Sequence, residues 1–201
     1  MRKLKKLLAI VAALAATIVG ANAATFDLKE CKDKATGCYI VTLKGKIEPG
    51  DGDAFHNLVQ SKGITNALVA LNSPGGEFDD GMTIANTVRL NKFTTWVGDG
   101  WECESMCSTI WLAGSRRFYQ GKAKIGFHGI YSAWVNSKTK KMTNIQPSNR
   151  GNALVGAFYN QLGLGSNAIA TLTDPAPDSM YWLDKNKAVE LGIQIEEDSR
   201  G

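Results

Sequence analysis

Segments with the residue pattern of β-strands alternate with segments of helical spacing along most of this chain. A β-branched, alternating stretch over 39–47 predicts a strand, and 52–63 has the apolar spacing of a helix. The same order returns at 64–73, a continuous apolar strand, and at 78–91, a second amphipathic helix. Parallel strands need such crossover helices between them, so the pattern predicts an α/β fold with a mostly parallel sheet.

The alternation continues through the C-terminal half without an internal repeat or a long linker. Further strands are predicted over 93–99, within 116–134, over 179–183 and over 193–197, and further helices over 108–115, 147–164, 166–174 and 184–192. The stretch from Ser132 to Arg150 is the least regular and is expected to form a surface excursion. A chain of 201 residues with this organisation is expected to form one α/β domain.

The first 23 residues have the three parts of a secretory signal peptide. Four basic side chains precede an apolar run from Leu7 to Val19, and Gly20-Ala21-Asn22-Ala23 supplies small residues for cleavage. The run is short for a membrane span, so cleavage after Ala23 is expected, with an uncleaved anchor as the alternative. The mature domain then comprises residues 24–201, in the periplasm or secreted, without membrane attachment after cleavage.

The charge balance argues against a nucleic-acid partner. The formal net charge of the whole chain is +4, and the signal segment carries four basic and no acidic side chains. The mature chain is therefore neutral overall. It lacks the basic composition that would indicate a nucleic-acid surface.

Four cysteines in an exported chain are expected to form disulfides. Three connectivities are possible, of which the local one, Cys31–Cys38 with Cys103–Cys107, is the simplest. A bond between Cys103 and Cys107 requires at least one of them to lie outside regular helix, or an unusually favourable geometry. A zinc site is disfavoured because the chain has no CxxC spacing and only two histidines, so no metal is expected.

Two strand-to-helix turns carry backbone N–H groups suited to acyl transfer. The first is Ser73-Pro74-Gly75-Gly76 and the second is Glu104-Ser105-Met106. Parallel α/β sheets bring such turns together at the carboxyl ends of their strands. The Gly-Gly pair lets a backbone N–H approach a substrate carbonyl, and Ser105 offers a hydroxyl. His128, after the next predicted strand, is the candidate base.

These turns stand in a sequence that resembles the Clp protease proteolytic subunit of the ClpP/crotonase superfamily. The stretches LNSPGGEFDDGMTIANTVR, ESMCSTIWLAGSRRFYQGKAKIGFHG and AVELGI carry the resemblance, which spans Gly45 to Ile193. A serine between two cysteines resembles the exported ClpP-like branch. The resemblance implies a spiral of repeated ββα units over 24–201, peptide-bond hydrolysis without a cofactor, homo-oligomeric assembly, and peptides or unfolded proteins as substrates.

The resemblance also implies a role for each residue of the site. Ser105 is the expected nucleophile and His128 the expected general base. The N–H groups of Gly76 and Met106 are the expected oxyanion hole. Together they predict a serine endopeptidase-like hydrolase.

The third position of the triad is less well defined by the sequence. Met180 stands where the family pattern places an aspartate. Asp178, two residues away, is favoured as the carboxylate that orients His128. Asp174 and a Ser–His dyad with no carboxylate are the alternatives.

Other functions stay open at this stage. Ser105 is also a favoured helix cap, and the negative charge of Glu104 would oppose an oxyanion beside it. A catalytically inactive ClpP-fold module for binding or assembly in the periplasm is therefore the alternative to a hydrolase. A third hypothesis is thiol redox or metal chemistry at Cys103, Cys107 and His128.

Overall fold

The structure is a computed structural model that describes residues 23–32, 37–139 and 142–199. The predicted signal peptide, apart from Ala23, lies outside these residues. Within the described ranges, no helix combines the length and the apolar character that a membrane crossing requires.

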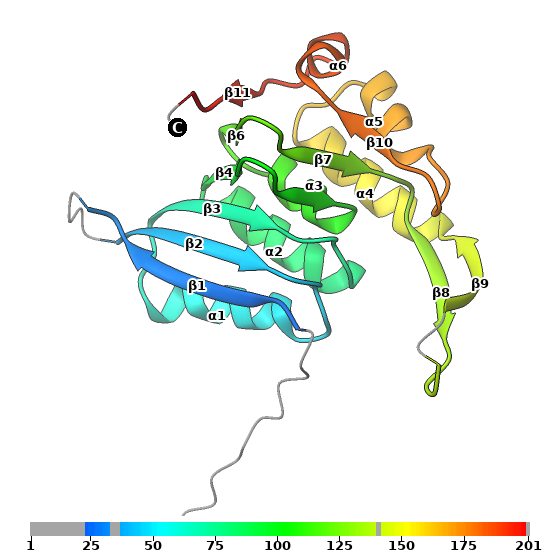
Figure 1. Cartoon of the computed structure of the whole chain (residues 1–201), viewed down its shortest axis with the longest axis horizontal. Coiled ribbons are helices and arrows are strands. Elements are labelled where there is room, and N and C mark those ends of the chain that lie inside the picture. The colour runs from blue at the N-terminus through cyan, green and yellow to red at the C-terminus, as the bar shows by residue number, and fades with distance from the viewer. Residues whose placement is uncertain (1–22, 33–36, 140–141, 200–201) are drawn as a thin grey trace, which may run out of the picture.

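A six-stranded sheet with the order β1-β2-β3-β4-β6-β11 forms the centre of the domain (Figure 1). Its strands are β1 (Thr25–Glu30), β2 (Cys38–Lys44), β3 (Asn66–Asn72), β4 (Thr94–Val97), β6 (Arg117–Tyr119) and β11 (Glu196–Glu197). Neighbours from β2 to β11 pair in parallel, as predicted, and β1 is an antiparallel edge strand. Strand β1 was not predicted, because Phe26 and Leu28 alternate with polar residues over too short a stretch.

A second, three-stranded sheet lies beside the first and has the order β10-β7-β5. It consists of β10 (Tyr181–Leu183), β7 (Lys124–Phe127) and β5 (Glu102–Glu104). β5 and β7 are parallel, whereas β10 is antiparallel to β7. The predicted surface excursion is a hairpin of β8 (Tyr131–Val135) and β9 (Met142–Pro147), which protrudes from the body of the domain in Figure 1.

Six helices connect these strands within the described residues. They are α1 (Asp51–Ser61), α2 (Phe78–Leu90), α3 (Met106–Leu112), α4 (Asn149–Gln161), α5 (Ser166–Thr173) and α6 (Lys185–Glu190). Side chains cap two of them, since Ser148 accepts the N–H of Gly151 and Asp184 accepts the N–H of Lys187. Both caps fall at helix starts that the sequence predicts.

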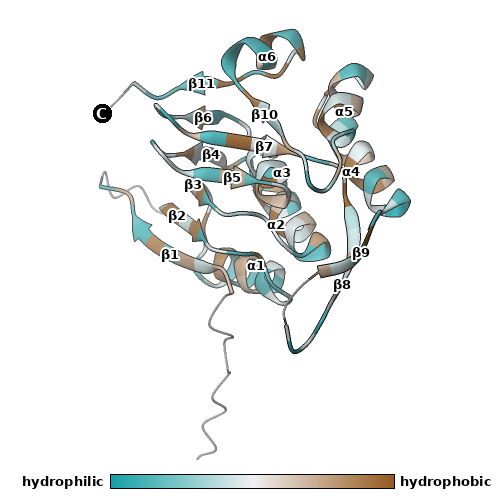
Figure 2. Ribbon diagram, turned by 45° about the vertical axis from the view of Figure 1, so that its right-hand side comes forward, coloured by the Kyte–Doolittle hydropathy of each residue, from teal (hydrophilic) through white to brown (hydrophobic). Residues whose placement is uncertain are grey.

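The short helix α3 is enclosed by the core, and all seven of its residues are buried. Trp111 is fully buried, and its indole N–H donates to the carbonyl of Phe118 at 3.0 Å. Figure 2 shows hydrophobic residues in the middle of β7, which packs against α3. Burial of each large apolar side chain contributes about 1.5–3 kcal/mol, so the start of α3 is fixed firmly in the fold.

Candidate active site

The two predicted turns lie side by side because their backbones pair directly. Ser73, just after β3, forms a parallel β-bridge with Cys103 in β5. The N–H of Ser73 donates to the carbonyl of Glu102 at 2.9 Å, and the N–H of Glu104 donates to the carbonyl of Ser73 at 3.0 Å. This pairing joins the ends of two strands from different sheets.

Gly75 and Gly76 have backbone conformations that favour glycine, with φ of 82° and 147°. Ile47 holds them from one side: its N–H donates to the carbonyl of Gly75 at 2.8 Å, and its carbonyl accepts the N–H of Glu77 at 2.9 Å. A Cβ on Gly76 would lie 2.0 Å from the carbonyl oxygen of Ile47. A Cβ on Gly75 would lie 2.8 Å from the nitrogen of Met106. A side chain at Gly75 would therefore clash with the Ser105 turn, and a side chain at Gly76 would clash with the backbone of Ile47.

The N–H groups of Gly76 and Met106 are the predicted oxyanion donors. In the described part of the chain, neither donates a hydrogen bond to a protein acceptor. Met106 is the first residue of α3, where a helix leaves its N–H groups without partners. Two unpaired N–H groups on adjoining turns are the donors that an oxyanion hole requires.

Ser105 connects β5 to α3 in a conformation that is rare for a residue with a side chain. Its φ is 55° and its ψ is −125°. Its N–H donates to the carbonyl of Gly126 at 3.0 Å, and its own carbonyl accepts the hydroxyl of Ser108 at 2.6 Å. Although Ser105 is the N-cap residue, its side chain forms no capping hydrogen bond. The structure thus gives no support to a capping role for its hydroxyl.

A disulfide spans the turn that presents Ser105. Cys103 in β5 is bonded to Cys107 in α3, with their Cα atoms 5.1 Å apart, and both cysteines are fully buried. The other bond joins Cys31 to Cys38. The local connectivity is therefore the one present, and one cysteine of the second bond lies outside helix, as its spacing requires. Neither bond leaves a free thiol for redox or metal chemistry among the described cysteines.

Removal of the Cys103–Cys107 bond by double substitution with alanine is expected to lower both stability and activity. Loop closure over this separation contributes about 2 kcal/mol to the free energy of unfolding, and a loosened Ser105 turn is expected to lower kcat roughly tenfold. Chemical denaturation and peptide hydrolysis measure the two effects.

The matched control is the Cys31–Cys38 pair, which closes a loop of similar length away from the turn. Its removal is expected to cost a similar free energy, about 2–3 kcal/mol, with kcat unchanged. Equal kcat values for the two double variants would contradict a bracing role for Cys103–Cys107.

His128 directly follows β7, two positions beyond Gly126, the last residue of β7 that pairs with β5. Its Nδ1 lies 2.7 Å from the carbonyl oxygen of Gly129. Because a carbonyl can only accept, Nδ1 carries the proton and Nε2 is the basic nitrogen of the neutral ring. In the described structure, no hydrogen bond joins Ser105 to His128.

The two candidate aspartates differ in their relation to His128. Asp174 ends α5, and the carbonyl of its neighbour Pro175 accepts the N–H of Gly129 at 2.9 Å. Asp178 lies in the following turn before β10. Among the described residues, neither carboxylate forms a hydrogen bond or ion pair with His128. The carbonyl of Gly129 occupies the place at Nδ1 that a triad carboxylate would take.

Glu104, directly before Ser105, is partly withdrawn from water. Burial raises the pKa of its carboxyl above the ordinary value, and the nearby Glu102 raises this pKa further. Lys124 and His128 lower the same pKa. His128 is thus close enough for Glu104 to interact with it electrostatically.

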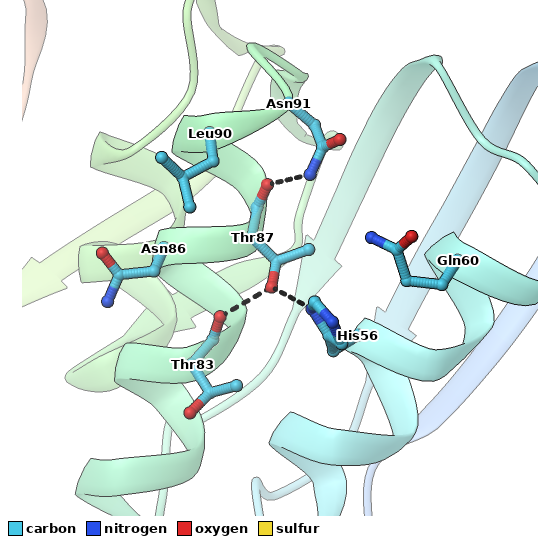
Figure 3. Close-up of a pocket in the computed structure, with 7 residues that line it drawn as sticks. All are labelled: His56, Gln60, Thr83, Asn86, Thr87, Leu90 and Asn91. Atoms are coloured by element: carbon cyan, nitrogen blue, oxygen red, sulfur yellow. Dashed lines mark hydrogen bonds between the residues drawn. The ribbon is translucent and has the colours of Figure 1, made fainter.

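A cavity of about 450 Å³ lies on the helical face, away from these turns (Figure 3). It is lined by His56 and Gln60 of α1 and by residues of α2 that include Thr87. Nδ1 of His56 lies 3.4 Å from the hydroxyl of Thr87. Figure 3 marks this contact with a dashed line. The cavity shares no lining residue with the Ser105 turn. Among the described residues, no group of three or more His, Cys, Asp or Glu side chains could hold a metal ion.

The two turns are visible in the sequence, but the residues that hold them are not. Ile47 fixes the Gly75–Gly76 loop through its backbone, and the hydroxyl of Ser73 accepts the N–H of Gly75 at 3.1 Å. The serine is visible in the sequence as part of the Ser-Pro-Gly-Gly turn. No sequence signal marks Ile47, since any apolar residue offers the same backbone groups.

Part of the chain matches the model of a known protein family. The family model described as Clp protease matches residues 53–147. No curated protein is significantly similar in sequence.

Solved structures of similar fold include two proteases. The 1510-N membrane-bound stomatin-specific protease, as a variant, has a TM-score of 0.59 and 17% identity over 82% of this chain and 80% of its own. A second variant of that protease, in complex with a substrate peptide, has a TM-score of 0.58 and 18% identity over 82% and 75%. ClpP1 from Listeria monocytogenes has a TM-score of 0.56 and 23% identity over 79% and 91%. Residues 53–147 thus match the Clp protease family model, and the chain folds as a single α/β domain of the ClpP/crotonase-like type.

Proposed function

We propose that this protein is an exported serine peptidase-like hydrolase that cleaves peptide bonds through Ser105 and His128. The observation that carries the proposal is the pairing of two turns, which brings Ser105 and the unpaired N–H group of Met106 against the Gly75–Gly76 turn with its unpaired Gly76 N–H group. The Ser105 hydroxyl forms no capping hydrogen bond. The Clp protease family match supports peptidase chemistry. The signal-like residues 1–23 support export to the periplasm or the medium.

The proposed reaction begins with attack of the Ser105 hydroxyl on a peptide carbonyl. Nε2 of His128 takes the hydroxyl proton, which requires the two side chains to approach when substrate binds. The N–H groups of Gly76 and Met106 then donate to the oxyanion of the tetrahedral intermediate. The amine leaves with the proton from His128, and water releases the acyl-enzyme by the same steps. No cofactor enters this sequence.

For the orientation of His128 we propose a backbone group in place of a triad carboxylate. The carbonyl of Gly129 already fixes the proton on Nδ1, which is the task of the aspartate in a triad. Of the two carboxylates, Asp174 is the better candidate for assistance, because the backbone next to it contacts Gly129. Comparison of kcat for Asp174→Asn and Asp178→Asn separates them.

Peptides and unfolded proteins are the proposed substrates, and a homo-oligomer is the proposed assembly. The related 1510-N protease is known in complex with a substrate peptide. Exposed apolar side chains on the β8–β9 hairpin, among them Trp134, Met142 and Ile145, are consistent with contacts between subunits. Sedimentation velocity measures the assembly directly.

The activity test uses the oxidised chain 24–201 with a reduced and alkylated protein as unfolded substrate. New N-termini, identified by mass spectrometry, are expected with the wild type, and replacement of His128 by alanine is expected to lower their rate of appearance about 100- to 10,000-fold. The same substrate in its folded form is the control and is expected to stay intact. An absence of new termini with the wild type would contradict the proposal.

The second candidate function is a binding or assembly module that lacks catalysis. Two observations favour it: Ser105 and His128 are not hydrogen-bonded in the described structure, and Glu104, directly before Ser105, adds a partly buried carboxylate near His128. Such a module would bind unfolded peptide without cleaving it. The digestion experiment separates the two functions when binding of the same substrate is measured in parallel.

A further inference from the structure

The backbone nitrogen of Ala24 lies inside the protein against a carboxylate. Its distance to Oδ2 of Asp51 is 3.1 Å. Ala24 is 8% exposed and Asp51 is 7% exposed. The same carboxylate oxygen accepts the N–H of Glu48 at 2.8 Å. Asp51 therefore connects the residue after the predicted cleavage position to the segment that leads into α1.

Asp51 is a buried carboxylate without a cationic side chain opposite it. Among the described residues, the ion pairs involve other acids, and the nearby Lys46 pairs with Glu48. A buried carboxylate is costly when it is not paired with a positive charge. In the unprocessed chain the nitrogen of Ala24 is a neutral amide and does not supply that charge.

We propose that cleavage after Ala23 supplies the missing positive charge, and that the α-ammonium group of Ala24 forms a buried ion pair with Asp51 in the mature protein. A signal peptidase hydrolyses the Ala23–Ala24 bond: the oxygen of water adds to the carbonyl carbon of Ala23, which becomes a carboxylate. The nitrogen of Ala24 leaves as an amine and takes a proton, since an α-amino group has a pKa of about 7.7–8.0. The inference rests on the proposed cleavage and is independent of hydrolase activity.

The ion pair connects processing to the candidate active site. Asp51 holds the N–H of Glu48, and the preceding residue, Ile47, holds the Gly75–Gly76 loop through two backbone hydrogen bonds. A charged partner for Asp51 thus stabilises the segment that positions the Gly76 N–H. Removal of the signal peptide would add this ion pair, so the Gly75–Gly76 loop is expected to be better ordered in the mature chain.

The test compares two recombinant chains that differ only at the N-terminus. One begins at Ala24 after proteolytic removal of a tag, and the other retains Ala23 behind an initiator methionine. Each is prepared as wild type, as Asp51→Asn and as Asp53→Asn, the last being an exposed carboxylate in the same helical turn and the matched control. Chemical denaturation gives the unfolding equilibrium constant of all six proteins.

The chain that begins at Ala24 is expected to have an unfolding equilibrium constant on the order of tenfold smaller than the extended chain. Asp51→Asn is expected to remove most of that difference, and Asp53→Asn to preserve it. Equal stability of the two wild-type chains, or independent effects of the extension and Asp51→Asn, would overturn the ion pair.

Hydrogen exchange of the two wild-type chains provides a second measurement, which does not depend on whether Asp51→Asn folds. The amides of Ile47 and Glu77 are expected to exchange several-fold more slowly in the wild-type chain that begins at Ala24 than in the extended one. Identical exchange at both amides would overturn the connection to the loop. Neither the denaturation measurement nor the hydrogen-exchange measurement requires catalysis. A failure of the proposed hydrolase function can therefore be distinguished from a failure of the ion pair.

Discussion

Replacement of Ser105 by alanine is expected to abolish peptide hydrolysis, with a fall in kcat on the order of 10,000-fold or more. The hydroxyl is the attacking group of the proposed reaction, whereas the nearby hydroxyls of Ser73 and Ser108 are hydrogen-bonded to the backbone of Gly75 and Ser105. The fold is expected to be retained, because the Ser105 side chain forms no capping hydrogen bond. Initial rates on an unfolded substrate, with the unfolding curve measured in parallel, give both quantities.

The matched control is Ser61→Ala, at an exposed serine in the last turn of α1. Its hydrolysis rate is expected to equal that of the wild type. If Ser105→Ala kept its rate within a few-fold of this control, Ser105 would not be the nucleophile.

Replacement of Gly76 by alanine is expected to lower the free energy of unfolding by about 3 kcal/mol or more. A Cβ at this position meets the carbonyl oxygen of Ile47 at 2.0 Å, and the φ of 147° is itself unfavourable for alanine. Relief of this clash separates the loop from Ile47 and displaces the Gly76 N–H. Activity is expected to fall together with stability, roughly 100-fold or more, as on removal of an oxyanion donor.

Gly163→Ala separates backbone strain from the clash. Gly163 has a φ of 90°, and a Cβ there would have no atom within 4 Å. The cost of this variant is expected to be about 1 kcal/mol, with unchanged activity. Denaturant titration of both variants checks the difference, and equal losses of stability would refute the role of the Ile47 contact.

Most of the fold could be predicted from residue periodicity, because each strand and helix buries one apolar pattern. The helices over 51–61 and 78–90 and the strand over 66–72 follow that pattern closely. Edge strand β1 could not be predicted, since its pairing with β2 depends on the rest of the sheet and not on a strong pattern of its own. Its position matters here, because Ala24 lies directly before it.

The candidate site could be predicted in its parts and not in its geometry. The turns around Gly76 and Ser105 follow from Gly and Pro punctuation between strand and helix patterns. The positive φ of Ser105 could not be predicted, since it depends on the Ser73–Cys103 bridge and on the buried start of α3. The hydrogen-bond partner of His128 could not be predicted either, because the backbone carbonyl that accepts from its ring has no signature in the sequence.

Buried charge is the second feature that the sequence did not reveal. Asp51 reads as an ordinary acidic residue in the first turn of a helix, where it favours the helix dipole. Only its contact with the nitrogen of Ala24 shows that it is buried beside the predicted cleavage position.

Covalent labelling with a fluorophosphonate tests the central claim most directly, because this reagent modifies a serine hydroxyl that a base and an oxyanion hole activate. The oxidised chain 24–201 is expected to gain one adduct, located on Ser105 by peptide mass spectrometry and lost in Ser105→Ala and His128→Ala. Undiminished labelling of Ser105→Ala, or an absence of any adduct on the wild type, would contradict the account.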